Sequence, residues 1–520
     1  MTAPAPTVTP PRAPPLARAT AAPDPRLPWI VAVACTLPFL GWWTYGLFDL
    51  DEGFYAAIVG EMLRRHEWIT PYYNGAPWYE KPILVYWAAI PFVKWLGPAV
   101  GPRLSAVLAT WATMGLAAWF ARRRLAPGTA LVAPLVLATS LLVVAVGRLM
   151  LTDPLLVLCL SAGLVWFWES LVGDGRWRWA AGAAIGFGVL AKGPVAIAFF
   201  VLIAAVTWWR EPALRARFRG GWIVASLLCL GVLATWYWPI YRANQNDFVR
   251  GFLWEQNVGR FLGGDTAHNV PWYGFLVFYV PVLLVGMAPW SLYLWRAWPR
   301  RDHAVTSHDA VRRYLQTWAL TVVIFFTASG SKLVHYMLPA MLPLALLVAD
   351  DCARRWAPVT LRVLVRPLVG VVAMAVFAQF AFTVYYGGLV AGGRTLVPGF
   401  HAELHRVAAE VGRQAASGDA IIEYQTGRQH RELPRISPPV IETSHPTLRF
   451  YLDRTIPGTD SLARVLDEPR RTWIITRSNR IEMADVSAAE RAGRTLARHA
   501  LPFKLTYYAL WTLSPRAATP

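Results

Sequence analysis

Residues 221–240 read GWIVASLLCLGVLATWYWPI, an apolar run without a charged side chain. An α-helix needs ~20 such residues to cross the ~30 Å hydrocarbon core of a bilayer. Comparable runs occupy Trp29–Phe48, Gly128–Gly147 and Tyr273–Trp295. We therefore predict a mainly α-helical, polytopic membrane protein.

The composition and the placement of charge support this prediction. Hydrophobic residues make up 56% of the 520 residues and charged residues 16%, with a mean hydropathy of +0.37. A soluble chain usually carries more charge. The net charge of +19 does not indicate a nucleic-acid partner, because arginines cluster in short loops between apolar runs, as at Arg122–Arg124 and Arg354–Arg366. This is the positive-inside pattern, which places these loops in the cytoplasm beside anionic lipids.

The basic loops also suggest a topology. Residues 1–27, rich in Pro, Ala and Thr, are expected to be a disordered cytoplasmic N-terminus, followed by a retained first helix. If the short stretch Pro82–Leu96 stays in the outer half of the membrane, about 11–13 transmembrane helices follow. Residues 28–390 then form the transmembrane domain, with extracytoplasmic loops at 49–81 and 241–272.

Residues 391–520 differ in character, because short β-type runs alternate there with helical ones. The expected strands are Ala420–Tyr424, Val440–Glu442, Leu448–Leu452 and Thr472–Thr476, and the expected helices are His401–Ala415 and Ala488–Ala500. We predict a small α/β domain on the extracytoplasmic side.

Three carboxylates follow the first apolar run directly, in Asp49-Leu50-Asp51-Glu52. Carboxylates at a membrane boundary are costly unless they are solvated, paired or used in function. They also suit the first turn of a following helix, so a simple helix cap is an equally good interpretation.

Lysine is scarce, since only five of the 50 basic residues are lysines. In the topology above, Lys81, Lys192 and Lys332 all lie at outer-face helix junctions. A compact ammonium group binds phosphate well, which makes the three lysines candidate phosphate ligands. Chance placement and an ordinary interfacial Glu80–Lys81 pair are the alternatives.

Further polar residues fall on the same predicted face. Asp153 stands before a proline at a strong helix-start signature, where it can cap the helix and also orient a catalytic loop. Arg148 and Arg242 are additional candidates for binding a phosphate. Glu80 and His268 could share a divalent metal, although two scattered residues are few for a metal site.

Seven short motifs occur in a fixed order. They are Asp51-Glu52 with Tyr55, Glu61-Met62-Leu63, Tyr79-Glu80-Lys81-Pro82, Thr152-Asp153-Pro154, Ala191-Lys192-Gly193-Pro194, Trp254 to Leu262 with His268 and Pro271-Trp272, and Ser331-Lys332-Leu333 with Tyr336-Met337-Leu338-Pro339. In these motifs the chain resembles the GT-C-fold lipid-linked glycosyltransferases, specifically the ArnT-like group related to protein O-mannosyltransferases.

The resemblance implies an enzyme with a catalytic acidic residue at Asp51 and a donor sugar carried on undecaprenyl phosphate or a related polyprenyl phosphate. We expect an inverting glycosyltransferase of the bacterial inner membrane whose active site faces the periplasm. The sugar could be a pentose such as aminoarabinose or a hexose, and the acceptor lipid A, another envelope glycan or a protein. No cofactor is required by this chemistry, and a divalent metal stays open.

The expected roles follow from charge. Asp51 orients or deprotonates the acceptor, and Asp153 assists it. Stabilisation of the leaving phosphate falls to a set of basic residues, namely Lys81, Lys192, Lys332, Arg148 and Arg242. Contacts to the substrates are expected from Glu52, Tyr55, Glu80 and Tyr336.

Two other functions fit the same sequence. A transporter or flippase of a lipid-linked sugar also places charges in membrane cavities. A non-catalytic envelope scaffold would use the C-terminal domain for binding. The concentration of unusual charges on one predicted face favours the enzyme.

Overall fold

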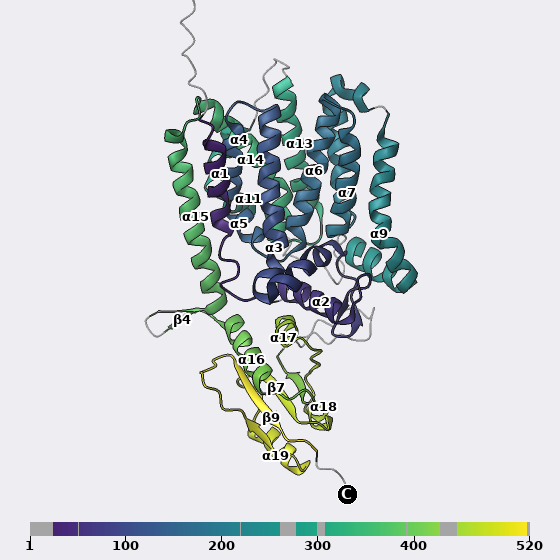
Figure 1. Cartoon of the computed structure of the whole chain (residues 1–520), viewed down its shortest axis with the longest axis vertical. Helices are drawn as coiled ribbons and strands as arrows, with labels where there is room; N and C mark the ends of the chain where they lie inside the picture. The colour runs from purple at the N-terminus through teal and green to yellow at the C-terminus, as the bar shows by residue number, and fades with distance from the viewer. Residues whose placement is uncertain are drawn as a thin grey trace, which may run out of the picture.

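The structure is a computed structural model that describes residues 24–49, 51–218, 220–259, 277–298, 307–391, 394–426 and 445–516. A bundle of roughly parallel helices carries a smaller α/β domain at one end, and helix α2 lies between the two (Figure 1). We call the end of the bundle that carries α2 the α2 end.

The bundle is built from helices of very different length. They are α1 (Leu27–Thr36), η1 (Leu37–Phe39), α2 (Asp51–Arg65), α3 (Leu84–Arg124), α4 (Thr129–Ala138), α5 (Leu141–Gly147), α6 (Thr152–Val172), α7 (Trp177–Lys192), α8 (Val195–Arg210), η2 (Pro212–Phe218), α9 (Trp222–Phe248), η3 (Val249–Gly259), α11 (Tyr279–Gly286), η5 (Trp290–Tyr293), α12 (Leu294–Ala297), α13 (Ser307–Ala328), η6 (Val334–Met337), α14 (Leu338–Arg355) and α15 (Leu361–Gly387). A short hairpin of β1 (Tyr72–Tyr73) and β2 (Ala76–Pro77) follows α2.

Several of these helices are long and apolar enough to cross a membrane. Within the described residues, five pass this test by length and composition, and six do so if α4 and α5, which meet at 66°, form one broken span. The chain is therefore a multi-pass membrane protein, as predicted. The expected count of 11–13 spans stays a prediction, because predicted spans such as α7 and α8 have only 16 residues each.

The stretch Pro82–Leu96 contains the first of the two helical parts that make up α3. A break at Gly97, where φ is 75° and ψ is −179°, separates it from the longer second part. A side chain rarely adopts a positive φ, so glycine permits this break. The expectation that this stretch stays in the outer half of the membrane stays a prediction.

The end of the bundle away from α2 is closed by buried ion pairs. Glu169, near the end of α6, accepts hydrogen bonds from Arg123 and Arg124 at the end of α3. Asp350 of α14 pairs with Arg312 of α13. Asp153 lies in the first turn of α6, at the α2 end. It is 169 − 153 = 16 residues, or about 24 Å, from Glu169, so the two acidic residues of this helix lie near opposite ends of the bundle.

The C-terminal domain contains a five-stranded mixed sheet in the order β6-β5-β7-β9-β8. Its strands are β5 (Ala420–Tyr424), β6 (Gly458–Thr459), β7 (Thr472–Arg477), β8 (Leu496–Arg498) and β9 (Tyr508–Leu513), and its helices are α16 (Phe400–Gln414), α17 (Pro446–Leu452), α18 (Leu462–Asp467) and α19 (Met483–Arg491). A hairpin of β3 (Leu389–Ala391) and β4 (Arg394–Val397) links it to α15. Strands β5, β6 and β7 are parallel, and β9 pairs antiparallel with β7 and β8.

Alternate residues of the sheet face two helical layers, as the period of a strand requires. Ile421 and Trp473 pack with α16 and α17, whereas Ile422 and Ile474 pack with α18 and α19. The predicted α/β domain is confirmed.

Two local predictions in this domain are wrong. Leu448–Leu452 belongs to helix α17, because short apolar runs do not distinguish a strand from a helix and Pro446 favours a helix start. Ala488–Ala500 is the end of α19 followed by β8. The predicted strand Val440–Glu442 lies outside the described residues.

Candidate active site

Three carboxylates from distant parts of the sequence converge around Tyr55 at the α2 end. Asp51 begins α2 with an exposed side chain, and Tyr55 lies one turn later and is buried. Burial raises the pKa of the Tyr55 phenol well above its usual value, and the negative charges of Asp51, Glu80 and Asp153 raise it further. The structure thus brings together four predicted site residues that belong to three separate sequence motifs.

Asp153 is buried and paired with Lys192. The Lys192 ammonium, at the end of α7, lies 2.6 Å from Oδ1 of Asp153. The other carboxylate oxygen lies 3.9 Å from Nε2 of His335, and Lys81 is within electrostatic reach. His335 was not among the predicted residues; its only sequence signal is its place directly before Tyr336 in one of the motifs.

Tyr336 connects this ion pair to the apolar part of the bundle. Its ring is buried, and the Lys192 ammonium lies 4.9 Å from the ring centroid. The ring also stacks on that of Phe326, with the two centroids 4.6 Å apart. A cation over an aromatic face is held without losing all of its hydrogen-bonding capacity. Lys192 is therefore anchored by one carboxylate and one ring.

Glu80 and Lys81 form the third part of the cluster. Their charged atoms lie 2.9 Å apart and both side chains are partly exposed. Tyr86 of α3 lies within electrostatic reach of Glu80, and its ring meets that of Tyr55 edge-on at 6.1 Å. The buried Tyr86 hydroxyl has no hydrogen-bond partner among the described residues. No sequence motif had singled it out, although an unsatisfied hydroxyl beside a cluster of charges is typical of a binding site.

Glu52, predicted to contact substrate, has a different role in the structure. It is buried and accepts four hydrogen bonds: from Arg103 Nε at 2.8 Å and Nη2 at 2.6 Å, and from the backbone of Met150 at 2.8 Å and Phe48 at 3.1 Å. Arg103 donates three more to the carbonyls of residues 42, 45 and 46. Glu52 therefore fixes, with Arg103, the loop before α2, and its contact with a substrate stays a prediction.

Arg148 and Arg242 are not brought to the cluster as phosphate ligands. Arg148 is fully buried and donates to the hydroxyl of Tyr45, the carbonyl of Pro38 and the side chain of Gln379. It thereby joins α5 to η1 and α15. Arg242 is exposed on α9, with its guanidinium over the ring of Trp238.

Lys332 is also engaged with the protein itself. Its buried ammonium donates to the carbonyls of Phe326 at 2.9 Å and Thr327 at 2.8 Å, and to that of Ser329. The first two are carbonyls of the last turn of α13, which have no partner within the helix, and Ser329 follows that turn directly. Lys332 therefore caps a helix C-terminus, as basic residues commonly do.

The predicted metal pair stays a prediction. In the part of the chain that the structure describes, no three His, Cys, Asp or Glu side chains come together as a metal site. Glu80 is paired with Lys81, and His268 lies outside the described residues.

An apolar groove of about 660 Å³ reaches η6, the short helix that also carries His335 and Tyr336. It is lined by α5, α11 and the start of η6, including Leu142, Phe278 and Val334. Val334 immediately precedes His335, so the same short helix carries groove-lining and site residues. The groove is almost entirely apolar and suits an alkyl or prenyl chain.

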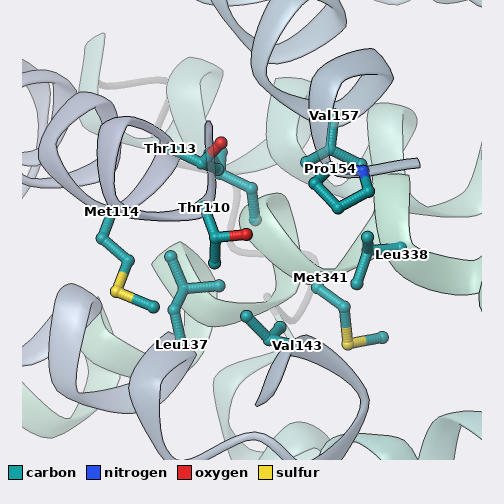
Figure 2. A pocket seen from close by; sticks show the side chains of 10 residues that line it. Thr110, Thr113, Met114, Leu137, Val143, Pro154, Val157, Leu338 and Met341 are labelled. Carbon is teal, nitrogen blue, oxygen red and sulfur yellow. The ribbon is translucent and has the colours of Figure 1, made fainter. Parts of the chain in front are cut away.

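A second, much smaller cavity of about 20 Å³ lies inside the bundle. Figure 2 shows its lining, with Thr110, Met114 and Leu137 on one side and Pro154, Val157 and Met341 on the other. The Thr110 hydroxyl is satisfied by the carbonyl of Ala106. This volume holds about one water at most, so the cavity is a packing defect behind Asp153 rather than a substrate site.

Comparison with known sequences gives matches over part of the chain. A family model described as dolichyl-phosphate-mannose-protein mannosyltransferase matches residues 33–244. An undecaprenyl phosphate-alpha-4-amino-4-deoxy-L-arabinose arabinosyl transferase of Pseudomonas paraeruginosa is 33% identical over 332 residues, 60% of this chain and 56% of that protein. A second such transferase, from Pseudomonas fluorescens, is 30% identical over 365 residues, 65% of this chain and 59% of that protein. The chain thus matches a little over half the length of these curated relatives.

Comparison with solved structures covers nearly the whole chain. The crystal structure of ArnT from Cupriavidus metallidurans bound to undecaprenyl phosphate aligns with a TM-score of 0.70 at 18% identity, over 93% of this chain and 97% of that one. Its apo state gives a TM-score of 0.68. The fold is therefore that of the GT-C lipid-linked glycosyltransferases. Within this class, sequence and fold both point to the ArnT-like group, which confirms the predicted resemblance.

Proposed function

We propose that this protein is an inverting glycosyltransferase that moves a sugar from a polyprenyl-phosphate carrier to an acceptor. The observation that carries the proposal is the meeting of the Asp51, Glu80–Lys81 and Asp153–Lys192 charges near η6, a short helix whose first residue, Val334, lines an apolar groove. A lipid-linked sugar has the same two parts, an apolar chain and a charged phosphate. We place the site on the periplasmic face of a bacterial inner membrane, in line with the arginine-rich loops at the other end.

The groove would hold the polyprenyl chain and the lysines its phosphate. When the acceptor oxygen attacks the anomeric carbon, the bond from that carbon to the phosphate oxygen breaks and the electron pair leaves with the phosphate. Lys81 and Lys192 stabilise this growing negative charge, which is the main electrostatic demand of the reaction. Attack opposite the leaving phosphate inverts the anomeric centre. Asp51 receives the proton of an acceptor hydroxyl, or orients an acceptor that is already anionic.

Asp153 positions Lys192 in this scheme. Its carboxylate lies 2.6 Å from the Lys192 ammonium and holds it at this end of α7. The names of the curated relatives suggest a donor to test first, undecaprenyl phosphate-linked 4-amino-4-deoxy-L-arabinose. Lipid A is the corresponding first acceptor, with other envelope glycans and proteins next.

The test is transfer by purified protein in detergent, followed by mass spectrometry of the acceptor. Product formation without a second compartment separates an enzyme from a transporter. We expect Asp51→Asn to lower the rate by roughly 10²–10⁴-fold, the usual worth of general acid–base catalysis, without lowering the unfolding temperature. The matched control is Asp174→Asn, the same change in an exposed residue paired with Arg176 in the loop before α7. An active, well-folded Asp51→Asn protein would remove Asp51 from this role.

Native mass spectrometry of gently purified protein gives an independent readout. A co-purified polyprenyl phosphate, with or without its sugar, supports the donor assignment and names the sugar by mass. If only bulk phospholipid is found even after addition of synthetic polyprenyl phosphate, the lipid-linked donor is ruled out.

A further inference from the structure

The loop that precedes Asp51 is held by the C-terminal domain as well as by the bundle. The backbone N–H of Leu47 donates to the hydroxyl of Tyr451 on α17 at 2.6 Å. The backbone N–H of Asp49 lies 3.4 Å from Nδ1 of His401 on α16. Burial lowers the pKa of His401 to about 4, so its imidazole is neutral and Nδ1 can accept. Residues just before Asp51 are thus fixed by side chains about 350–400 positions away in the sequence.

The side chain of Asp49 in turn caps the N-terminus of α17 in the C-terminal domain. The N–H of Thr447 donates to Oδ1 of Asp49 at 3.1 Å. The helix's own N-cap residue, His445, provides no side-chain cap. A cap acceptor is normally supplied by the residue at the helix start, since the first N–H groups have no partner within the helix. Here the acceptor comes from the other domain.

The helices approach so closely that only glycine fits at the contact. A Cβ atom at Gly53 would lie 2.7 Å from Oδ1 of Asp49, 2.9 Å from the backbone N of Thr447 and 3.0 Å from Pro446. The first turn of α2, which begins at Asp51, is therefore seated directly on the start of α17, as the position of α2 between bundle and domain in Figure 1 illustrates.

The Asp49 carboxyl is in an environment that favours its neutral form. Its side chain is 7% exposed, and Oδ2 has no hydrogen-bond partner among the described residues. Burial raises the pKa of Asp49 to about 7, against the opposing effects of Thr447 and Arg449. The titratable or charged groups that face it come from α15, α16, the start of α17 with the residue before it, β5 and β9, and they are Tyr386, His401, His445, Arg449, Glu423 and Tyr508.

We propose that Asp49 is a positioning residue, which caps α17 and thereby lets the C-terminal domain set the orientation of the Asp51 carboxylate. The C-terminal domain then takes part in catalysis through geometry, without placing a side chain on the substrate. This proposal rests on the proposed transferase function.

The central comparison is between Asp49→Ala and Asp49→Asn. Asparagine keeps an acceptor oxygen for the Thr447 N–H and resembles the protonated carboxyl, whereas alanine removes the cap. We expect Asp49→Ala to lower kcat at least tenfold while the donor KM stays within about twofold, because a displaced catalytic group costs rate more than binding. Asp49→Asn should retain kcat within about threefold. The control, Asp453→Asn, removes the exposed pair with Arg64 across the same interface and should leave kcat unchanged.

Hydrogen exchange of the full-length protein gives a readout that does not need activity. The Thr447 amide should exchange faster in Asp49→Ala and at the wild-type rate in Asp49→Asn. If Asp49→Ala fails to fold, Gly53→Ala tests the same contact with Asp49 intact, and it should lower kcat by forcing α17 off α2.

Three results would overturn the proposal. They are a fully active Asp49→Ala, an Asp49→Asn as defective as Asp49→Ala, and, where Asp49→Ala does not fold, a fully active Gly53→Ala. Absence of transfer by the wild-type protein would instead refute the proposed function itself, and the two failures are therefore distinguishable.

Discussion

Replacing Glu52 by glutamine separates an anchoring role from a substrate-binding role. The two Glu52 oxygens accept four hydrogen bonds, two from the buried Arg103 and two from the backbone. Glutamine keeps the shape but turns one oxygen into an NH₂ donor. That donor would face two N–H groups, and the Arg103 guanidinium would lose its only described carboxylate partner.

The expected cost follows from burial. The side chains of Glu52 and Arg103 are 3% and 2% exposed. Breaking a buried ion pair by removing one partner costs about 3–5 kcal/mol, because the remaining charge stays buried. An exposed pair such as Arg64–Asp453, with side chains 30% and 69% exposed, contributes at most about 1 kcal/mol. Glu52→Gln should therefore lower the unfolding temperature by roughly 5–10 °C and Asp453→Asn by no more than about 2 °C.

The assay is thermal unfolding of the detergent-purified variants, followed by intrinsic tryptophan fluorescence at one scan rate. Arg103→Met and the double variant complete a double-mutant cycle, in which the two changes should be strongly non-additive. A Glu52→Gln protein with the wild-type unfolding temperature and a raised donor or acceptor KM would refute the anchoring role. It would restore Glu52 as a substrate ligand.

Two further predictions concern Lys332 and Asp49. Lys332→Met should destabilise the protein by about 2–4 kcal/mol, because three carbonyls at the end of α13 lose a charged donor. The folded fraction should keep its kcat. A stable variant with a raised donor KM would instead support the predicted role of Lys332 in phosphate binding. Burial raises the pKa of Asp49 from 3.8 to about 7, so between about pH 4 and 7 the folded chain holds a proton on Asp49 that the unfolded chain has lost. The contribution of Asp49 to the free energy of unfolding is therefore fully present below about pH 4 and is lost as the pH rises through 7. The unfolding temperature should therefore fall more between about pH 5 and 8 for wild type than for Asp49→Asn, and equal slopes would refute the shift. The buried Glu423, whose pKa is raised to about 8, contributes in the same direction in both proteins, and less in Asp49→Asn, because the Asp49 charge is one cause of its raised pKa.

The fold was largely predictable because the relevant signals are local. Apolar runs of bilayer length and arginine-rich loops each report directly on a span or its end. The C-terminal strands β5 and β7 were predicted almost to the residue, since each is a β-branched run between turns. Helix α17 was predicted as a strand because its seven residues pack on two sides, Leu448 against the C-terminal sheet and Phe450 against the bundle. Their apolar pattern therefore does not show the period of a single helix face.

The residues that form the charged cluster could be predicted from the sequence, but the partner of each residue could not. Asp51 and Asp153 lie within electrostatic reach of Tyr55, and Lys81 and Lys192 lie within electrostatic reach of Asp153. Glu52 carries the same sequence signal as Asp51, yet it points to a different partner. Whether a carboxylate is satisfied inside the protein depends on what lies across from it, and residue 103 is 51 positions away.

The contrast between arginine and lysine at the α2 end has a physical basis. Arg103 and Arg148 each present a rigid, planar set of donors, and each uses it to bind several protein acceptors at once, holding loops in one place. Lys192 has a single described hydrogen bond, to Asp153, and rests on the ring of Tyr336. An ammonium on a flexible stem, held by one carboxylate, can turn toward a phosphate without dismantling the fold. A chain that uses arginine almost everywhere else therefore has a chemical reason to keep lysine at this position, and replacing Lys192 by arginine should cost phosphate stabilisation although the charge is conserved.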